Sequence, residues 1–451
     1  MNYVYYCVVR KRRERVGQSG MNSNNNLKIK YMNKVSTIKV VLLLQLLTHI
    51  CYGQPLPCEK TMEESLKQTA EMLNKQEAKD LWNVSLNAPL IIINHMENKM
   101  YFTAIENGTV QPLKEEAWNN KVPLANSIFE YEGKKYVIII HAALMFSPCE
   151  ERLNLLAHEI FHLHQNGLGI QNTMSTNFYM DEIEGRALLQ IEMKALQQAL
   201  DGDLQSLHDA LYIRAYRQSL YPHNNEEMYE LNEGLAEYTG AKLTKTNVQQ
   251  YVKSRLNYDI NAGYSNSFGY ATGAAYAVIL DGLYPKWKFD EDLGKGMTFL
   301  IKRSNPQYAV TVDNSYINRL LNKYHHDKIL NEEKEAIKSF GDIAAFEKLL
   351  DPKTSKLQII NNGVNFTYNP NDRIIALKNA VLLRNITIMG EWGQISVKSG
   401  IVRLNDWSAF YLLPPKEITA NVIQGSDYEI RLNNGWKVVE QNGNYKIERG
   451  E

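Results

Sequence analysis

The residues of this chain best suited to chemistry are two histidines and a glutamate in the segment His158-Glu159-Ile160-Phe161-His162. On an α-helix, positions four residues apart lie on the same face, so His158 and His162 can direct two imidazole nitrogens at one metal ion. Glu159 lies beside that face, within reach of a water molecule on the metal. Zinc suits such a site because it accepts imidazole nitrogen and lowers the pKa of its water to about 7. The pattern therefore predicts a zinc site with Glu159 as a general base.

The flanking residues indicate that this segment is helical. Pro148 and the acidic pair Glu150-Glu151 precede it, as is typical of a helix start, and the apolar residues around the histidines include no proline. The alternative interpretation is a buried amphipathic helix whose two histidines only satisfy internal hydrogen bonds.

Two histidines and a water need a third protein ligand, and the best candidate lies in the segment Asn232-Glu233-Gly234-Leu235-Ala236. Together with the His-Glu-x-x-His segment, it resembles the gluzincin metallopeptidases, the thermolysin and aminopeptidase superfamily, whose aminopeptidases carry an Asn-Glu-Gly-x-Ala motif. The resemblance covers chiefly residues 150–285. It implies a zincin-like catalytic core in which Glu233 is the third zinc ligand.

The spacing of the motifs departs from those aminopeptidases, because residues 163–232 separate the second histidine from Glu233, a much longer interval than in the family. An inserted helical hairpin that includes residues 182–219 would account for the difference. Glu182 and Glu184 lie at the shorter, thermolysin-like distance. They remain rival ligands, although their sequence context does not match the motif.

Two further residues are candidates for supporting roles. Glu237 lies one helical turn after Glu233, where its carboxylate could accept the free ring N–H of a ligand histidine; the alternative is an exposed glutamate near a helix end. Residues 270–281 are similar to the Tyr-x-x-Gly helix of the aminopeptidases, which implies that Tyr270 donates to the oxyanion; the alternative is a packing tyrosine. The Gly-x-Met-x-Asn motif that reads a free amine in those enzymes does not occur in the sequence, so exopeptidase action is not supported.

Residues 1–53 are predicted to be a leader. Its core, residues 32–53, combines a basic start with an apolar run too short to span a bilayer comfortably, as in a secretory signal peptide cleaved after Gly53. A single signal-anchor helix and a lipid anchor at Cys51 are the alternatives. The protein is accordingly expected to be exported, either to a periplasm or out of the cell.

Removal of the leader would leave two cysteines, Cys58 and Cys149. In an oxidising compartment such a pair can form a disulfide, which would attach the mature N-terminus just ahead of the metal-binding helix. A loop of this length could gain about 4 kcal/mol from the bond in the chain-entropy treatment. The alternative is two unrelated buried thiols.

The mature chain is expected to comprise three regions. Residues 54–149 combine a helix with strand hairpins, and residues 150–350 are mostly helical and hold the metal ligands. Residues 355–451 consist of short alternating runs split by Asn and Gly turns, which predicts a small antiparallel β-sandwich or barrel. The fold class is thus α+β, a catalytic core of sheet and helices followed by an all-β domain.

The same periodicities predict the individual elements. Helices are expected at residues 60–82, 182–200, 205–219, 226–241, 247–256, 267–284, 291–303, 313–325 and 330–349. Strands are expected at residues 89–93, 100–103, 127–131 and 136–140. The last of these could be a free sheet edge along which an extended substrate pairs; an ordinary buried strand is the alternative.

Acidic and basic residues number 50 each and are mixed along the chain, which argues against a nucleic-acid binder because such a protein needs a basic face. The motifs and the resemblance together predict an exported zinc metallopeptidase that hydrolyses peptide or protein substrates through a zinc-activated water, with Glu159 as general base. No stable membrane span is expected in the mature chain. Two alternatives stay open: a zinc-bearing surface protein that binds through its β-domain, and a zinc amidohydrolase acting on a non-peptide amide.

Overall fold

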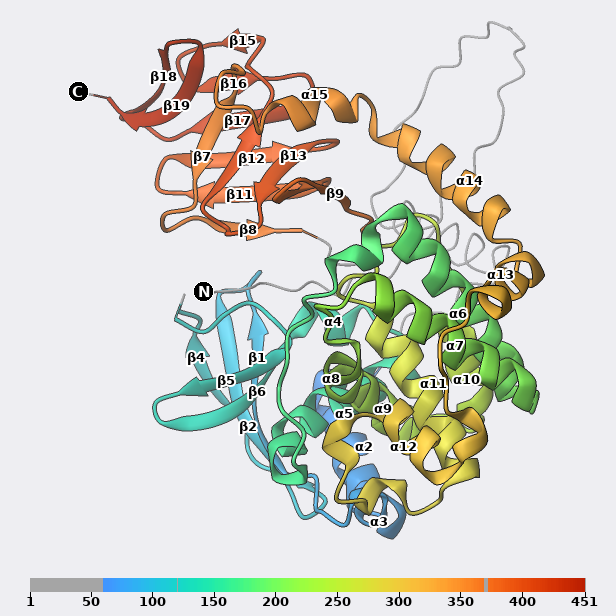
Figure 1. Cartoon of the computed structure of the whole chain (residues 1–451). Coiled ribbons are helices and arrows are strands. Elements are labelled where there is room, and N and C mark those ends of the chain that lie inside the picture. Colours follow the sequence, from blue (N-terminus) through green and yellow to red (C-terminus); the bar gives the residue numbers. More distant parts are fainter. Residues whose placement is uncertain (1–59, 120, 369–371, 451) are drawn as a thin grey trace, which may run out of the picture.

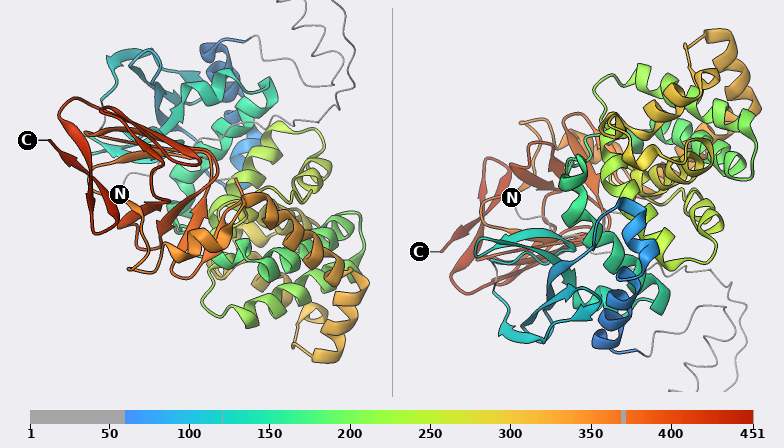
Figure 2. Two further views of the ribbon diagram at one scale, coloured as in Figure 1. Left: turned by 90° about the horizontal axis from the view of Figure 1, so that it is seen from above. Right: turned by 90° about the horizontal axis from the view of Figure 1, so that it is seen from below.

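The computed structural model describes residues 60–119, 121–368 and 372–450; the predicted leader and Cys58 lie outside them. Three regions follow one another along the chain: a sheet with helices packed on it, a helical region, and a C-terminal region of strands (Figure 1). Figure 1 shows the C-terminal strands to one side of the N-terminal sheet, and the two views of Figure 2, taken along that direction, show them in front of the sheet and behind it. The α+β fold class predicted from the sequence is confirmed.

The N-terminal sheet is built from β1 (Ala88–Asn94), β2 (Lys99–Glu106), β3 (Thr109–Val110), β4 (Lys114–Ala117), β5 (Ser127–Tyr131) and β6 (Lys134–Ile140). Its main path runs β3-β2-β1-β6-β5, and β4 pairs with β2. β1 and β2 form the expected antiparallel hairpin, whereas β1 and β6 are parallel. Neighbouring residues of a strand point to opposite faces, so Leu90 and Ile92 join the main core while Ile91 and Ile93 join a smaller cluster.

The prediction that residues 136–140 form a free sheet edge is wrong, because β6 lies between β1 and β5. Residues 137–140 are buried, as is usual for a strand with neighbours on both sides and both faces covered. The strand at that edge of the sheet is β5 instead.

The first helices are α2 (Met62–Leu73), α3 (Gln76–Trp82), α4 (His141–Met145) and α5 (Cys149–Gln165). The single helix predicted at residues 60–82 is therefore two. Thr61 and Glu64 form a capping box, in which each side chain accepts a hydrogen bond from the other residue's backbone N–H, and this fixes the start of α2. Trp82, at the end of α3, packs on Phe161 of α5 with ring centroids 4.9 Å apart.

The helical region contains α6 (Ile183–Leu200), α7 (Leu204–Leu220), α8 (Glu226–Tyr229), the π-helical turn η3 (Glu230–Gly234), α9 (Leu235–Thr244), α10 (Val248–Arg255), α11 (Phe268–Leu283), α12 (Met297–Ser304), α13 (Asn314–Lys323), α14 (His326–Ile337) and α15 (Ile343–Lys348). Short 3₁₀ turns are η1 (Asn166–Leu168), η2 (Phe178–Asp181), η4 (Trp287–Phe289), η5 (Leu293–Lys295), η6 (Pro306–Tyr308) and η7 (Lys338–Phe340). Three predicted helices are interrupted. The one at 226–241 contains η3, the one at 330–349 contains η7, and the one at 291–303 breaks at Gly296, whose φ of 110° favours glycine.

The hairpin of α6 and α7, which matches the helical hairpin expected within 182–219, carries a group of buried charges that we call the arginine cluster. Arg214 Nη2 pairs with Glu230 Oε2 at 2.7 Å, and Arg214 Nη1 pairs with Glu192 Oε1 at 3.3 Å. Arg217 Nη2 pairs with Glu192 Oε2 at 2.6 Å and with Glu226 Oε2 at 2.7 Å. All five side chains are at most 1% exposed. Because buried charges are tolerated only when paired, the cluster fixes α8 and η3 against the hairpin.

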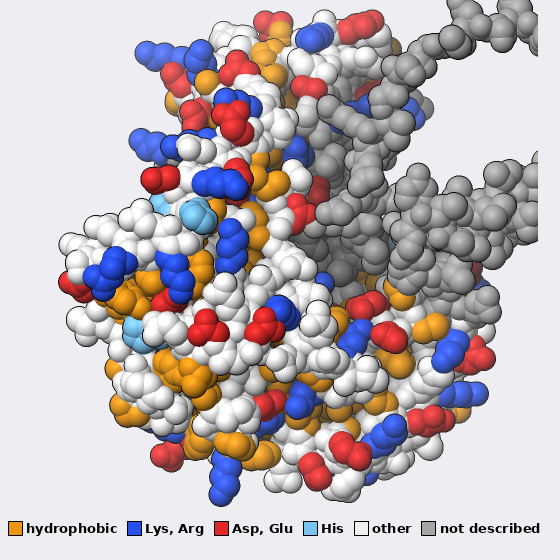
Figure 3. Space-filling model, turned by 90° about the vertical axis from the view of Figure 1, so that its right-hand side faces the viewer, with side chains coloured by type: hydrophobic (Ala, Val, Ile, Leu, Met, Phe, Trp, Pro, Cys, Tyr) orange, Lys and Arg blue, Asp and Glu red, His pale blue; other side chains and the backbone are white. Residues whose placement is uncertain are grey.

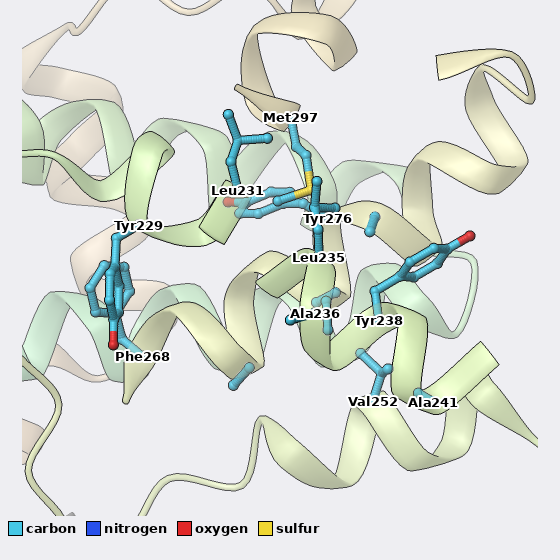
Figure 4. Packing of buried hydrophobic residues seen from close by; sticks show 14 of the residues in the cluster. Tyr229, Leu231, Leu235, Ala236, Tyr238, Ala241, Val252, Phe268, Tyr276 and Met297 are labelled. Carbon is cyan, nitrogen blue, oxygen red and sulfur yellow. The ribbon is translucent and has the colours of Figure 1, made fainter. Parts of the chain in front are cut away.

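Apolar side chains hold η3 from another direction. Figure 4 shows Leu231 of η3 grouped with Tyr276 of α11 and Met297 of α12, all within the main hydrophobic core. Tyr229, just before η3, lies against Phe268 of α11 with ring centroids 5.5 Å apart. The π-helical turn is thus enclosed by ionic contacts from α6 and α7 and by apolar contacts from α11 and α12.

The C-terminal strands are β7 (Leu357–Ile360), β8 (Asn365–Thr367), β9 (Ile375–Leu377), β10 (Ala380–Leu383), β11 (Ile386–Gly390), β12 (Gly393–Val397), β13 (Ile401–Leu404), β14 (Ala409–Leu412), β15 (Glu417–Ile418), β16 (Val422–Gln424), β17 (Tyr428–Leu432), β18 (Trp436–Gln441) and β19 (Asn444–Arg449). They form two sheets, β18-β19-β7-β14-β13-β10-β9 and β15-β16-β17-β12-β11-β8. Phe410 and Leu412 of the first sheet share one core with Ile388 and Ile430 of the second. This arrangement is a sandwich, one of the two architectures expected for the region, and we refer to it as the β-domain.

Three further expectations from the sequence concern a disulfide, a membrane span and the distribution of surface charge. Cys149 is disulfide-bonded, while Cys58, its expected partner, lies outside the described residues. Among the described helices, none has the length and apolar character needed to cross a bilayer. Acidic and basic side chains are interspersed on the face shown in Figure 3.

Replacing Arg217 by methionine tests the arginine cluster. The Arg217→Met variant should lose about 3–5 kcal/mol of unfolding free energy, because Glu192 and Glu226 would keep buried charges without their main partner. Arg319→Met is the control, since Arg319 is an exposed residue of α13 and its loss should cost less than about 0.5 kcal/mol. Urea unfolding of the two variants measures the difference, and equal losses would contradict a central role for the cluster.

Candidate metal centre

The two histidines of the His-Glu-x-x-His segment lie on α5, where this helix packs against α9. The helices approach closely because α9 has Gly240 at the contact, where a Cβ would overlap Oδ1 of Asn154. Both histidine side chains are largely buried, with 6% exposure for His158 and 11% for His162. Their Nε2 atoms are 3.1 Å apart, so the helical spacing does direct both rings at one point.

Polar partners on the far side of each ring leave the two Nε2 atoms available to a cation. Gln165 Nε2 donates to the backbone O of Asn232 at 2.6 Å, so Gln165 Oε1 is an acceptor, and it lies 2.7 Å from Nδ1 of His162. Glu237 Oε2 lies 3.5 Å from Nδ1 of His158. Both arrangements favour a proton on Nδ1 and a lone pair on Nε2. Two unprotonated nitrogens this close repel each other, so either a proton or a metal cation must lie between them.

Glu233 completes a set of three converging ligand atoms. Its Oε2 lies 3.5 Å from Nε2 of His158 and 3.5 Å from Nε2 of His162. This oxygen is buried and has no hydrogen-bond partner among the described residues, while Oε1 accepts from Asn232 Nδ2 at 2.9 Å. The ligand atoms of the three residues all lie within 4.8 Å of one another. A buried acceptor without a donor, facing two imidazole lone pairs, is the arrangement that a metal ion would satisfy.

The π-helical turn and the glycines around it set the position of Glu233. Single π-helical turns are frequent at functional sites because they redirect side chains locally. A Cβ on Gly234 would lie 2.5 Å from Cα of Gly273 and 2.7 Å from the backbone O of Gly269. No side chain fits between η3 and α11 there, so the two backbones are in direct contact. The glycine of the Asn-Glu-Gly motif thereby brings α11, with Tyr270, close to Glu233.

Glu237 belongs to a chain of hydrogen bonds behind His158. Tyr251 Oη donates to Glu237 Oε1 at 2.7 Å, and Asn154 Nδ2 donates to Tyr251 Oη at 2.7 Å. Arg255 Nε lies 3.4 Å from Glu237 Oε1. The carboxylate is therefore held from α5 and α10 and faces His158, and it is not at an exposed helix end.

The two carboxylates make the site favourable for positive charge. Burial acts to raise the pKa of Glu237, but Arg255 and His158 lower it to about 2. Burial acts to lower the pKa of His158, but the carboxylates of Glu233 and Glu237 raise it to about 10. The electrostatic field that stabilises a proton on this imidazole would also stabilise a metal cation in the proton's place.

Glu159 and Tyr270, the two residues expected to act on substrate, both lie at the site. Burial raises the pKa of Glu159 above its ordinary value, against the opposing effect of His158 and His162, and a raised pKa suits a general base near neutral pH. The Tyr270 ring stacks on the His158 imidazole with centroids 5.5 Å apart and planes 2° apart. Burial and the nearby carboxylate of Glu233 raise the pKa of Tyr270 well above its usual range, so its hydroxyl stays protonated and can donate.

The rival ligands lie elsewhere. Glu182 Oε2 accepts from Tyr221 Oη at 3.4 Å, and Glu184 Oε1 lies 3.0 Å from Nε2 of His326. Neither belongs to the group of converging ligand atoms, whose carboxylate comes from Glu233.

Three residues at the site were not predicted from the sequence: Gln165, the partner of His162, and Tyr251 and Arg255, which contact Glu237. Gln165 could have been found, because it follows His162 by three positions on the same helix and therefore shares its face. Tyr251 and Arg255 come from α10, and their sequence carries no local signal of a contact with α5 or α9.

Comparisons with protein-family models, with curated proteins and with solved structures return no significant match. Within the described part of the chain, the acidic, histidine and cysteine side chains close enough to share a metal ion are His158, His162 and Glu233. Two imidazoles and one carboxylate, with a buried glutamate and a tyrosine hydroxyl beside them, can hold a cation and transfer protons next to it.

Removing the carboxylate of Glu233 tests the ligand set. The Glu233→Ala variant should bind Zn²⁺ more weakly by more than about 100-fold, the upper range for changes outside the ligand set. Glu184→Ala is the matched control and should keep the wild-type affinity. Competition with a chromophoric chelator measures both. Retention of zinc by Glu233→Ala together with its loss from Glu184→Ala would transfer the ligand role to Glu184.

Neutralising Glu237 tests the hydrogen-bond chain behind His158. Glu237→Gln should weaken Zn²⁺ binding by about 10–100-fold, because the amide orients and polarises the imidazole less well than the carboxylate does. Glu151→Gln, on the partly exposed part of α5, is the control and should leave affinity unchanged. The same chelator titration distinguishes them, and equal affinities would show that Glu237 does not support the site.

Proposed function

We propose that this chain is an exported zinc metallopeptidase of the gluzincin type. The observation that carries the proposal is the convergence of two Nε2 lone pairs and an unpartnered buried carboxylate oxygen, with Glu159 adjacent on the same helix. Export is supported by the disulfide at Cys149, because disulfides persist mainly in oxidising compartments. The resemblance of both motifs to the gluzincins points to the same class of enzyme.

Zinc is the metal that this donor set favours. Two histidine nitrogens with one carboxylate oxygen are a common catalytic zinc set, which leaves a further coordination position open. Bound there, zinc would supply Lewis acidity, lowering the pKa of a water molecule and polarising a carbonyl group. The orientation of both rings by Gln165 and Glu237 prepares the ligands before the metal arrives.

The residues of the chain divide the proton transfers between them. Glu159, buried and with a raised pKa, takes a proton from the attacking water and delivers it to the nitrogen of the leaving amine. Tyr270, held against His158, donates its hydroxyl proton in a hydrogen bond to the oxygen that gains negative charge. A peptide bond provides both the carbonyl and the amine that this arrangement serves.

The decisive variant is Glu159→Gln, which keeps the shape of the side chain and removes the base. It should retain wild-type zinc stoichiometry and lose about 10²- to 10⁴-fold in kcat, the usual contribution of general base catalysis. The assay is cleavage of a mixed peptide and unfolded-protein library by zinc-loaded protein, read by mass spectrometry. Glu151→Gln is the control and should cut like the wild type.

Two results would refute the proposal. Undiminished turnover by Glu159→Gln would remove Glu159 as the base. A zinc-loaded wild type that cleaves no member of the library would favour the alternative of a binding protein, or of a hydrolase for non-peptide amides.

A further inference from the structure

The segment that leads into α11, residues 257–267, is held in place by buried charged side chains. Arg186 of α6 donates from Nη2 to the backbone O of Ile260 at 3.0 Å. Asp181 accepts hydrogen bonds from two successive backbone N–H groups of the segment, at 2.9 and 2.8 Å. Arg186 and Asp181 are themselves paired at 3.0 Å. An irregular segment fixed in this way owes its position to these side chains and not to its own secondary structure.

One member of this buried group comes from the β-domain. Arg373, which lies two residues before β9, is 1% exposed. Its Nη1 donates to the O of Ile260 at 3.0 Å, and its Nη2 pairs with Glu333 Oε2 at 2.7 Å. Glu333 of α14 pairs in turn with Arg186 Nε at 2.8 Å. The backbone N–H of Arg373 also donates to the O of Asn261 at 3.0 Å, beside an isolated antiparallel bridge between the two stretches.

The far end of the segment meets the metal centre. Asn266 accepts at its backbone O from Tyr229 Oη at 2.6 Å, and Tyr229 immediately precedes η3 with its metal-ligand candidate. Helix α11 begins at Phe268, and Tyr270 lies in its first turn. A displacement of residues 257–267 would therefore move the start of α11, where Tyr270 lies.

We propose that Arg373 is a positioning residue for the metal centre, acting through residues 257–267 on Tyr270. The buried guanidinium of Arg373 donates to a carbonyl of the segment and pairs with the carboxylate of Glu333, so it cannot shift without leaving its own charge poorly paired, which is costly at this depth. The β-domain is then part of what aligns the catalytic site, not an attached binding module. The activity measurement below rests on the proposed peptidase function, whereas the exchange measurement does not.

The test is a double-mutant cycle of Arg373→Met and Tyr270→Phe in the zinc-loaded full chain. Tyr270→Phe should lower kcat by about 100-fold, as loss of an oxyanion donor does. Arg373→Met should lower kcat by about 10-fold through misplacement of that donor, with zinc stoichiometry and KM close to those of the wild type. In the Tyr270→Phe background the Arg373→Met effect should vanish. Additive losses would overturn the proposal, because they would mean that Arg373 acts by a route other than Tyr270.

Two further variants separate positioning from loss of folding. Arg373→Lys keeps the charge facing Glu333 but lacks the planar fork that serves both partners, so its kcat should lie between wild type and Arg373→Met. If Arg373→Met does not fold, the cycle is run with Arg373→Lys. Arg403→Met removes another buried arginine of the β-domain, which lies 3.7 Å from the Trp407 ring centroid, and should leave kcat unchanged. An equal loss in Arg403→Met would overturn the assignment to Arg373.

Hydrogen exchange provides a readout that needs no catalysis. The amides of Tyr264 and Ser265, which donate to Asp181, should exchange at least 10-fold faster in the Arg373 variants and at the wild-type rate in Arg403→Met. Unchanged exchange in the Arg373 variants would overturn the proposal even if they lose activity. If the Arg373 variants show the faster exchange but the wild type has no peptidase activity, the proposed function is refuted and the positioning role of Arg373 stands.

Discussion

The arginine cluster is the interaction on which the rest of the structure depends. Arg214 and Arg217 are fully buried on α7, and they can remain charged there only because Glu192, Glu226 and Glu230 face them. Glu226 begins α8 and Glu230 begins the π-helical turn that follows it, so the pairing fixes the hairpin of α6 and α7 and the segment of Glu233 as one unit. The long interval between the two motifs is thus occupied by the element that holds the second motif in place.

The candidate metal centre is also held by polar contacts from side chains around it. Each ligand side chain has a specific partner on its far side: Gln165 for His162, Glu237 for His158 and Asn232 for Glu233. The three remaining donor atoms face one another and carry lone pairs or negative charge. Internal hydrogen bonds therefore do not satisfy the histidines completely, and the interpretation of α5 as a merely structural amphipathic helix does not account for the unpartnered oxygen of Glu233.

Local periodicity was sufficient to predict the parts of the fold that depend on nearby residues. The helix of His158 and His162, the hairpin of β1 and β2, and most helix boundaries follow from spacing along the chain. Other features depend on residues far apart in sequence, so local patterns could not predict them. They are the pairing of β6 with β1, the π-helical turn at Glu233 and the contacts of Tyr251. The break near residue 74 was missed because both halves of 60–82 have helical composition and only the caps separate them. The position of Glu233 beside the two histidines could be predicted because its motif is short and contiguous, although its distance from His162 along the chain gave no indication of it.

The glycine contact between η3 and α11 limits how this protein could be altered. With backbone against backbone at Gly234 and Gly273, neither helix can slide or rotate without a clash, so Glu233 and Tyr270 keep a fixed relative position. The connection after α5, residues 169–177, offers little more freedom, because Ile170 and Asn177 in it are buried. Sequence drift should accordingly be severely restricted at these two glycines, where the backbones of η3 and α11 touch.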